Sequence, residues 1–152
     1  MPERRFILGG AGWHDKPIPP NVQAIGHVPT TEHNAFNCSA LAVLNVARDS
    51  MAEIGFSPAT RVFEAAGAGA CLITDAWRGI ELFLEPGEEI LVARDGKDVA
   101  AQLGSLTTER ARAIGERARA RILAEHTYAK RARLVDGLLR DALARKRESV
   151  AA

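Results

Sequence analysis

Short apolar runs alternate along the chain with segments of helical periodicity. Five of these runs are apolar almost throughout and about five residues long, which is typical of strands buried on both faces of a parallel sheet. They cover residues 6–8, 22–26, 40–46, 71–74 and 89–93. Helical segments between successive strands are the pattern of crossover connections. The sequence therefore predicts a Rossmann-like α/β fold, with a doubly wound parallel sheet of about five strands.

Helix signals separate and follow these strands. Thr30 or Thr31 can start a short helix that ends at Phe36, Ser57 and Pro58 start a second as cap and first helical residue, and residues 96–103 form a third. Two long helices close the chain at 107–124 and 127–146, each with an apolar stripe that has to be buried. The stripes are Ala111, Ile114, Ala118 and Ile122, and Tyr128, Ala132, Val135, Leu139 and Ala142. We expect one domain over residues 1–146 and a frayed tail over residues 147–152.

Composition narrows the class of protein. The 152 residues are 47% hydrophobic, which is enough for one domain with a proper core, and a formal net charge of +1 gives no global reason to bind nucleic acid or a membrane surface. No apolar run approaches the roughly 18 residues of a membrane span, and the N-terminus opens on charge without an apolar signal core. Cys38 and Cys71 lie in apolar surroundings, which indicates free buried thiols in a reducing compartment. We therefore expect a cytoplasmic protein.

Charge is distributed unevenly, although the total is nearly balanced. Residues 107–152 hold 12 Lys and Arg against 6 Asp and Glu, a net of +6, which leaves 8 against 13, a net of −5, for residues 1–106. The C-terminal third is thus a basic helical segment attached to a mildly acidic body. Its simplest interpretation is a solvated helix face.

Candidate ligand groups gather where the predicted strands end, because open α/β sheets bind ligands beyond the carboxyl ends of their strands. Those ends carry Gly10, Gly12, His27, Val28 and Arg48. The helix start at Ser57 presents free backbone N–H groups, which favour phosphate when Arg48 or Arg61 is near. Glu64, further into the same helix, is a candidate acceptor for ribose hydroxyls. Together these groups predict a nucleotide-like ligand.

The central run LNVARDSMAEIGFSPATRVFEAAGAGACLITDAWRGIELFLEPGEEILV, at residues 44–92, resembles the donor-binding half of two-domain GT-B glycosyltransferases. The similarity is to the spore-maturation CgeB-like group of the family 1/4 clan. The opening strand with GGAGW, the segment NVQAIGHVP and the helices ERARAIGERARARILAEHTYAKRA are similar as well. The resemblance therefore covers nearly the whole chain.

This resemblance implies a site for a nucleoside-diphosphate sugar. Glu64 would hold the ribose, His27 and Val28 would flank the base, and Gly10 and Gly12 would let the backbone approach the donor. The helix start would meet the diphosphate through Ser57, Pro58, Ala59, Thr60 and Arg61. Helix N–H groups with Arg48 or Arg61 would stabilise the departing diphosphate. Such chemistry needs no metal or cofactor, and His14, His33 and His126 show no zinc-ligand spacing.

The chain departs from that family pattern in two ways. Many relatives in the wider clan carry a second glutamate eight positions before the ribose glutamate, where this chain has Phe56. Such enzymes also have an N-terminal domain that binds the acceptor and usually supplies the catalytic base, whereas this chain opens at what corresponds to an early strand of the C-terminal domain. We therefore expect sugar transfer only with an acceptor-binding domain supplied by another chain or lost by truncation.

Other interpretations stay open from the sequence alone. Glu64 could be a surface glutamate paired with Arg61, His27 could simply end a strand, and the domain could be a binding or interaction module without transfer. The stripe of the last helix, which includes Tyr128, Val135, Leu138, Leu139 and Ala142, is longer than a five-stranded body needs. We therefore expect a homodimer or a complex through that helix, with basic residues at its rim.

Overall fold

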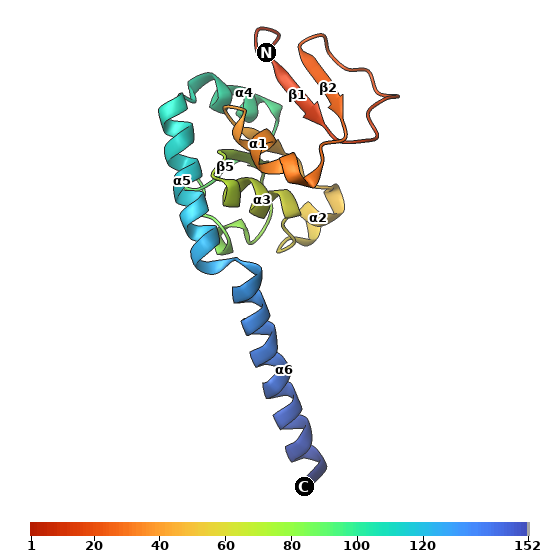
Figure 1. Ribbon diagram of the computed structural model, residues 1–152, viewed down its shortest axis with the longest axis vertical. Coiled ribbons are helices and arrows are strands. Elements are labelled where there is room, and N and C mark those ends of the chain that lie inside the picture. Colours follow the sequence, from red (N-terminus) through yellow and green to blue (C-terminus); the bar gives the residue numbers. More distant parts are fainter. Residues whose placement is uncertain (152) are drawn as a thin grey trace.

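The strands form two separate parallel sheets (Figure 1). The computed structural model describes residues 1–151. The first sheet pairs β1 (Phe6–Gly9) with β2 (Val22–Gly26), and the second has the order β3-β4-β5, from Val43–Asn45, Leu72–Asp75 and Leu91–Ala93. The α/β class with parallel strands is confirmed, whereas a single sheet of five strands is wrong. Apolar runs locate strands but do not specify which edges pair, and in the described chain β1 and β3 share no ladder.

The helices follow the expected order with two differences. Their bounds are Thr30–Glu32 (η1), His33–Cys38 (α1), Asp49–Ile54 (α2), Thr60–Ala68 (α3), Ile80–Leu82 (η2), Gly96–Ser105 (α4), Thr108–Glu125 (α5) and Tyr128–Ala151 (α6). The short helices α2 and η2 were not predicted, because six and three residues are too few to show a clear helical period. Helix α3 starts at Thr60 with Ala59 as N-cap, so the predicted cap at Ser57 is wrong.

The late start of α3 has a backbone cause. Gly55 and Phe56 both adopt positive φ angles, of 72° and 53°, which end α2 and turn the chain away from helical geometry. The Phe56 N–H donates to the Arg78 carbonyl oxygen at 2.7 Å, and the Arg78 guanidinium lies 4.9 Å from the centroid of the Phe56 ring. Residues 55–59 therefore form a loop fixed against the segment that follows β4.

Two adjoining apolar clusters make up the core, and α5 contributes to both of them. The predicted stripe of α5 is buried, as are most residues of β4 and the inner face of α3. Helix α5 approaches the end of α3 so closely that a Cβ built on Gly115 would overlap the Gly69 carbonyl group. The absence of a side chain at Gly115 therefore sets how closely α5 packs on α3.

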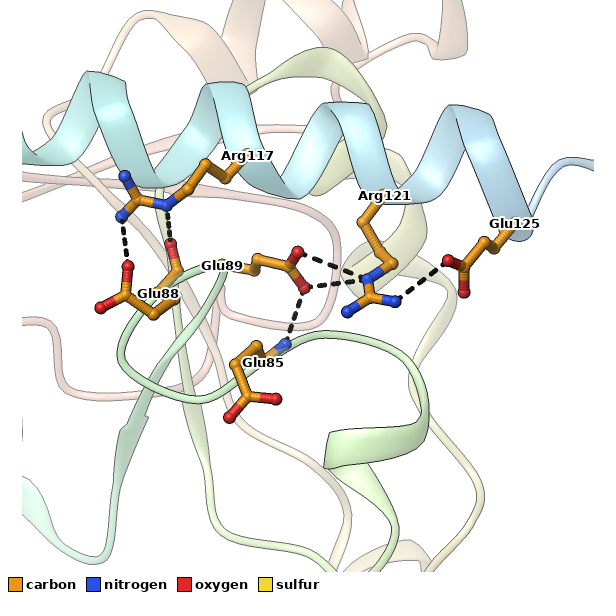
Figure 2. Close-up of polar contacts among 6 residues, drawn as sticks. All are labelled: Glu85, Glu88, Glu89, Arg117, Arg121 and Glu125. Atoms are coloured by element: carbon orange, nitrogen blue, oxygen red, sulfur yellow. Dashed lines mark hydrogen bonds and ion pairs between the residues drawn. The ribbon is translucent and has the colours of Figure 1, made fainter.

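A polar network fixes α5 to the loop before β5 (Figure 2). Arg121 Nε donates to both carboxylate oxygens of Glu89, at 3.3 and 3.2 Å, and its Nη1 donates to Glu125 at 3.0 Å. The same Glu89 carboxylate accepts from the backbone N–H of Glu85 at 2.8 Å. Arg117 donates to the Glu88 carbonyl oxygen at 2.8 Å. The Glu89 side chain is only 15% exposed, so these hydrogen bonds replace the water that its carboxylate loses on burial.

Helix α6 leaves the body at an aromatic joint and extends away from it (Figure 1). The rings of Phe63, Phe83 and His126 form one cluster, in which the His126 centroid lies 6.1 Å from that of Phe63 and 5.6 Å from that of Phe83. The Arg131 guanidinium lies over both phenyl rings. Beyond the joint the apolar stripe is not covered by this chain. More than half of each of these side chains is exposed: Tyr128, Leu134, Val135, Leu138, Leu139 and Leu143.

Three further observations bear on the sequence expectations. The expected frayed tail over residues 147–152 is helical through Ala151, and residue 152 lies outside the described residues. Both cysteines are free as expected, but only Cys71 is buried, since Cys38 lies exposed at the end of α1. None of the helices in the described part of the chain combines the length and apolar character needed to cross a membrane.

Candidate nucleotide-sugar site

The glycine loop after β1 lies against the end of β2. The Gly10 N–H donates to the Gly26 carbonyl oxygen at 2.6 Å, and Gly10 and Gly12 have positive φ angles of 119° and 89°. A Cβ on Gly9 would come within 2.9 Å of the Val28 side chain. At Gly9 the chain can lie this close to Val28 only because the residue has no side chain, whereas a Cβ on Gly10 or Gly12 would meet no close contact. The loop brings the predicted residues Gly10 and Val28 to one edge of the first sheet.

A histidine joins the end of β2 to helix α3. His33 Nε2 lies 3.1 Å from the Val28 carbonyl oxygen, and its Nδ1 lies 3.8 Å from Glu64 Oε2. His33 is in the first turn of α1, which packs along α3. Glu64 therefore faces His33 rather than forming the alternative surface pair with Arg61. The side chains of His33 and Glu64 are 35% and 45% exposed, so a ligand can reach both.

His33 is a candidate that the sequence reasoning missed. Its spacing to the other histidines carries no metal-ligand signal, and its hydrogen-bond partner at Val28 is a backbone carbonyl, which no side-chain motif displays. His27, which was a candidate, is exposed beside Val28. The structure therefore brings Val28 and Glu64 together through a residue that stands between them in the sequence.

The mouth of α3 lies one turn from Glu64. Its N-cap Ala59 makes no side-chain hydrogen bond to the helix, so the first N–H groups, beginning at Thr60 and Arg61, have no capping acceptor. The preceding Ser57 is exposed and Pro58 is half-buried, in the loop that rests on Arg78. Unsatisfied N–H groups at a helix start carry partial positive charge and favour an anion.

Two arginines lie on the segments before and within this helix start. Arg48 is the N-cap residue of α2 and Arg61 is the second residue of α3, and both are exposed. Neither forms a salt bridge within residues 1–151. Their guanidinium groups are thus available to a ligand phosphate.

A buried polar cluster ties together the carboxyl ends of β3 and β4. Asn45 Nδ2 donates to the Thr74 hydroxyl at 3.1 Å, and the Thr74 hydroxyl donates to Asp75 Oδ1 at 3.1 Å. The same Asp75 oxygen accepts from the Ala47 N–H at 2.9 Å. Asn45 Oδ1 is buried without a partner. This cluster, also missed from the sequence, fixes where Arg48 leaves the sheet.

Within the described residues the candidate groups coincide neither with a metal cluster nor with an apolar cleft beside the first sheet. Within the described residues no three His, Cys, Asp or Glu side chains are grouped so as to hold a metal ion. An apolar cleft of about 660 Å³ lies elsewhere, between the amino ends of β1 and β2 and helix α4, with Phe6, Leu44 and Leu103 among its lining residues. The strand-end groups are better suited than that cleft to bind a polar ligand, because they combine N–H donors, cations and a carboxylate.

Comparison with known proteins places this geometry in context. A family model described as glycosyl transferase-like matches residues 1–136. A search of curated proteins finds no match. Among solved structures the chain is similar to sucrose-phosphate synthase from Thermosynechococcus elongatus, with a TM-score of 0.63 and 19% identity over 82% of this chain and 31% of that chain.

A second similar structure is AviGT4, a glycosyltransferase involved in avilamycin A biosynthesis. Its TM-score is 0.49, with 23% identity over 74% of this chain and 37% of that chain. The chain thus spans about a third of the length of each of these two structures. Its α/β fold, with parallel sheets and long C-terminal helices, matches the fold of GT-B glycosyltransferases.

Proposed function

The chain belongs to the glycosyl transferase-like family, and on that premise we propose that it binds a nucleoside-diphosphate sugar as the donor domain of a glycosyltransferase. We also propose that the chain is a member of the spore-maturation CgeB-like group, because residues 44–92 resemble that group. The observation that carries the donor proposal is the position of Glu64. Glu64 lies one turn after the start of α3, which has no side-chain cap, and its Oε2 is 3.8 Å from His33 Nδ1. His33 in turn is hydrogen-bonded to the Val28 carbonyl oxygen, just after β2.

In this proposal each part of the donor meets a matching group. The ribose hydroxyls donate to Glu64, the base lies beside His27 and Val28, and the glycine loop at Gly10 and Gly12 admits the donor close to the backbone. The diphosphate lies at the mouth of α3, from Ser57 to Arg61. Charge-assisted hydrogen bonds of this kind are the strong ones in proteins.

The proposed chemistry is the breaking of the bond between the sugar's anomeric carbon and the diphosphate oxygen. Negative charge develops on that oxygen as the bond breaks, and the N–H groups of Thr60 and Arg61 with the Arg48 and Arg61 side chains stabilise it. Fixed donors aimed at developing charge are often the largest catalytic contribution. No cofactor or metal enters this proposal. The acceptor and the catalytic base belong to an acceptor-binding domain outside residues 1–152, so we propose that these residues alone transfer no sugar.

A nucleotide-binding screen tests the proposal directly. Calorimetry or thermal shift with UDP, GDP, dTDP and ADP sugars should reveal one binding partner, and the failure of all four at millimolar concentration would remove the donor-site assignment. Glu64→Gln keeps the side-chain shape but removes the charge, which should cost roughly 1.5 to 3 kcal/mol of binding. Glu116→Gln is the matched control, because it disrupts only an exposed pair with Arg112 on α5.

A second candidate function is supported by α6. Its apolar side chains are exposed along a helix that extends from the body, and contiguous exposed apolar surface usually marks a contact with a partner. We propose that this surface pairs with a second copy of the chain or with the acceptor-binding chain. In a module without transfer, this pairing would be the main activity. A cytoplasmic location is also our proposal, and the two free thiols support it.

A further inference from the structure

The hydrogen bond to Val28 fixes which nitrogen of His33 carries a proton. A carbonyl oxygen only accepts hydrogen bonds, so the 3.1 Å contact requires an N–H at Nε2. In the neutral imidazole the other nitrogen, Nδ1, then presents a lone pair. That lone pair lies on the side of the ring that faces Glu64, at 3.8 Å from its Oε2.

Two acceptors thus face the same space. A distance of 3.8 Å is too long for a direct hydrogen bond, and when Nε2 carries the hydrogen of the neutral ring, neither Nδ1 nor a carboxylate has a hydrogen to donate to the other. One hydroxyl carries only one hydrogen and can fully satisfy only one acceptor. A pair of neighbouring hydroxyls on adjacent carbons satisfies both, with one O–H directed at each.

We infer that His33 and Glu64 form a two-acceptor site for a cis-diol, in which His33 binds one ribose hydroxyl and Glu64 binds the other. This inference rests on the proposed nucleoside-diphosphate ligand and adds a binding residue to it. The His33 ring is rigid, so its hydrogen bond to the Val28 carbonyl oxygen also fixes where Nδ1 would meet the diol. Discrimination between ribose and deoxyribose is therefore built into this pair.

The test compares binding of ADP, GDP and UDP with binding of their 2′-deoxy and 3′-deoxy analogues, taking whichever base binds the wild-type chain best. In the wild type each missing hydroxyl should weaken binding, by about 12- to 150-fold for the one that Glu64 accepts and about 2- to 12-fold for the one that His33 accepts. In His33→Phe the second of these penalties should disappear, while the first stays.

Two conservative variants separate a binding role from a structural one. His33→Asn places an amide oxygen near the position of Nδ1 and should keep the dependence on both hydroxyls. His33→Gln reaches toward the Val28 carbonyl with its amide N–H but offers no acceptor at the Nδ1 position, so it should behave as His33→Phe does. Melting temperatures of all three variants verify that each is folded.

The outcomes distinguish the two proposals. If neither these three nucleotides nor dTDP binds the wild-type chain, the proposed function fails, and the diol site fails with it. If dTDP alone binds, only the diol site is overturned, because its sugar has no 2′-hydroxyl. If one of the three binds but folded His33→Phe keeps both hydroxyl penalties, only the diol site is overturned. Tighter binding by His33→Phe would overturn it as well, because it would mean that a charged His33 competes with the ribose for Glu64.

Discussion

Replacing Gly115 by alanine should separate helix α5 from helix α3 and destabilise the fold that carries the candidate site. A Cβ at this position would overlap the Gly69 carbonyl oxygen and lie 2.8 Å from the carbonyl carbon of Gly69 and 3.1 Å from that of Ala70. These are backbone atoms that cannot rotate away as a side chain would. Relief therefore requires α5 to move off the end of α3, the helix on which Glu64 lies.

Two opposing terms set the magnitude. Alanine favours a helix interior over glycine by about 1 kcal/mol, whereas overpacking a tight contact typically costs about 1–3 kcal/mol and sometimes more. Because the overlap at Gly115 involves backbone, we expect the high end of that cost and a net loss of about 1–2 kcal/mol. For a chain of this size each kcal/mol shifts the melting temperature by about 2–4 °C. The variant should therefore melt about 2–8 °C below the wild type.

Gly104→Ala is the matched control. This glycine also lies inside a helix, α4, and a Cβ built on it meets nothing within 4 Å. The same chemical change should therefore leave the melting temperature unchanged or raise it, by up to about 1 kcal/mol of stability. Circular dichroism melts of the three proteins make the comparison. A Gly115→Ala protein as stable as Gly104→Ala would refute the close approach of α5 to the Gly69–Ala70 backbone.

Three further predictions concern the helices and their joint. Burial and the nearby Arg131 lower the pKa of His126 below the ordinary histidine value of 6.5, which holds in the unfolded chain. The free energy of unfolding should therefore be constant above pH 6.5 and fall as the pH is lowered below it. Thermal melts between about pH 5 and 8 should show this dependence, and His126→Leu should abolish it. Leu139→Glu should convert a self-associating wild type to monomer in light scattering, and monomers for both proteins would exclude pairing of two copies through α6. Thr107→Ala should cost about 0.5–2 kcal/mol, because its hydroxyl accepts from the Arg110 N–H at 3.2 Å, while Thr108→Ala should have a smaller effect.

The sequence predicted the elements of this fold better than their arrangement. The helical period of the apolar residues gave α5 and the start of α6, because that signal is local. The hydroxyls of Thr107 and Thr127 cap the two helices, accepting from the Arg110 and Lys130 N–H groups. Pairing between strands is not local, and nothing in the apolar runs indicated that β1 and β3 remain apart. The start of α3 was misplaced because Ser57 and Pro58 look like a cap, while the positive φ of Phe56 depends on a hydrogen bond to Arg78.

In the candidate site, too, local features could be predicted from the sequence and contacts between distant residues could not. Strand ends and glycines could be placed from the pattern alone, and Gly10 does meet the end of β2. The role assigned to Glu64 stays a prediction, although the structure gives it a neighbour in His33. That neighbour could not be predicted, because it depends on a backbone carbonyl and on the packing of α1 against α3. The Asn45–Thr74–Asp75 cluster likewise arises from the register of two strands.

The separation of the two sheets has a consequence for how ligand binding and folding are linked. A two-stranded ribbon such as β1–β2 is only marginally stable by itself. The proposed donor would contact this ribbon at Gly10 and Val28 and the larger unit at Glu64, so it would bridge two parts that have no backbone ladder between them. Binding that needs both parts in place adds its free energy to the stability of the weaker one. Amide hydrogens of residues 6–9 and 22–26 should therefore exchange with solvent markedly more slowly when the nucleotide is bound, whereas those of β4 should change little.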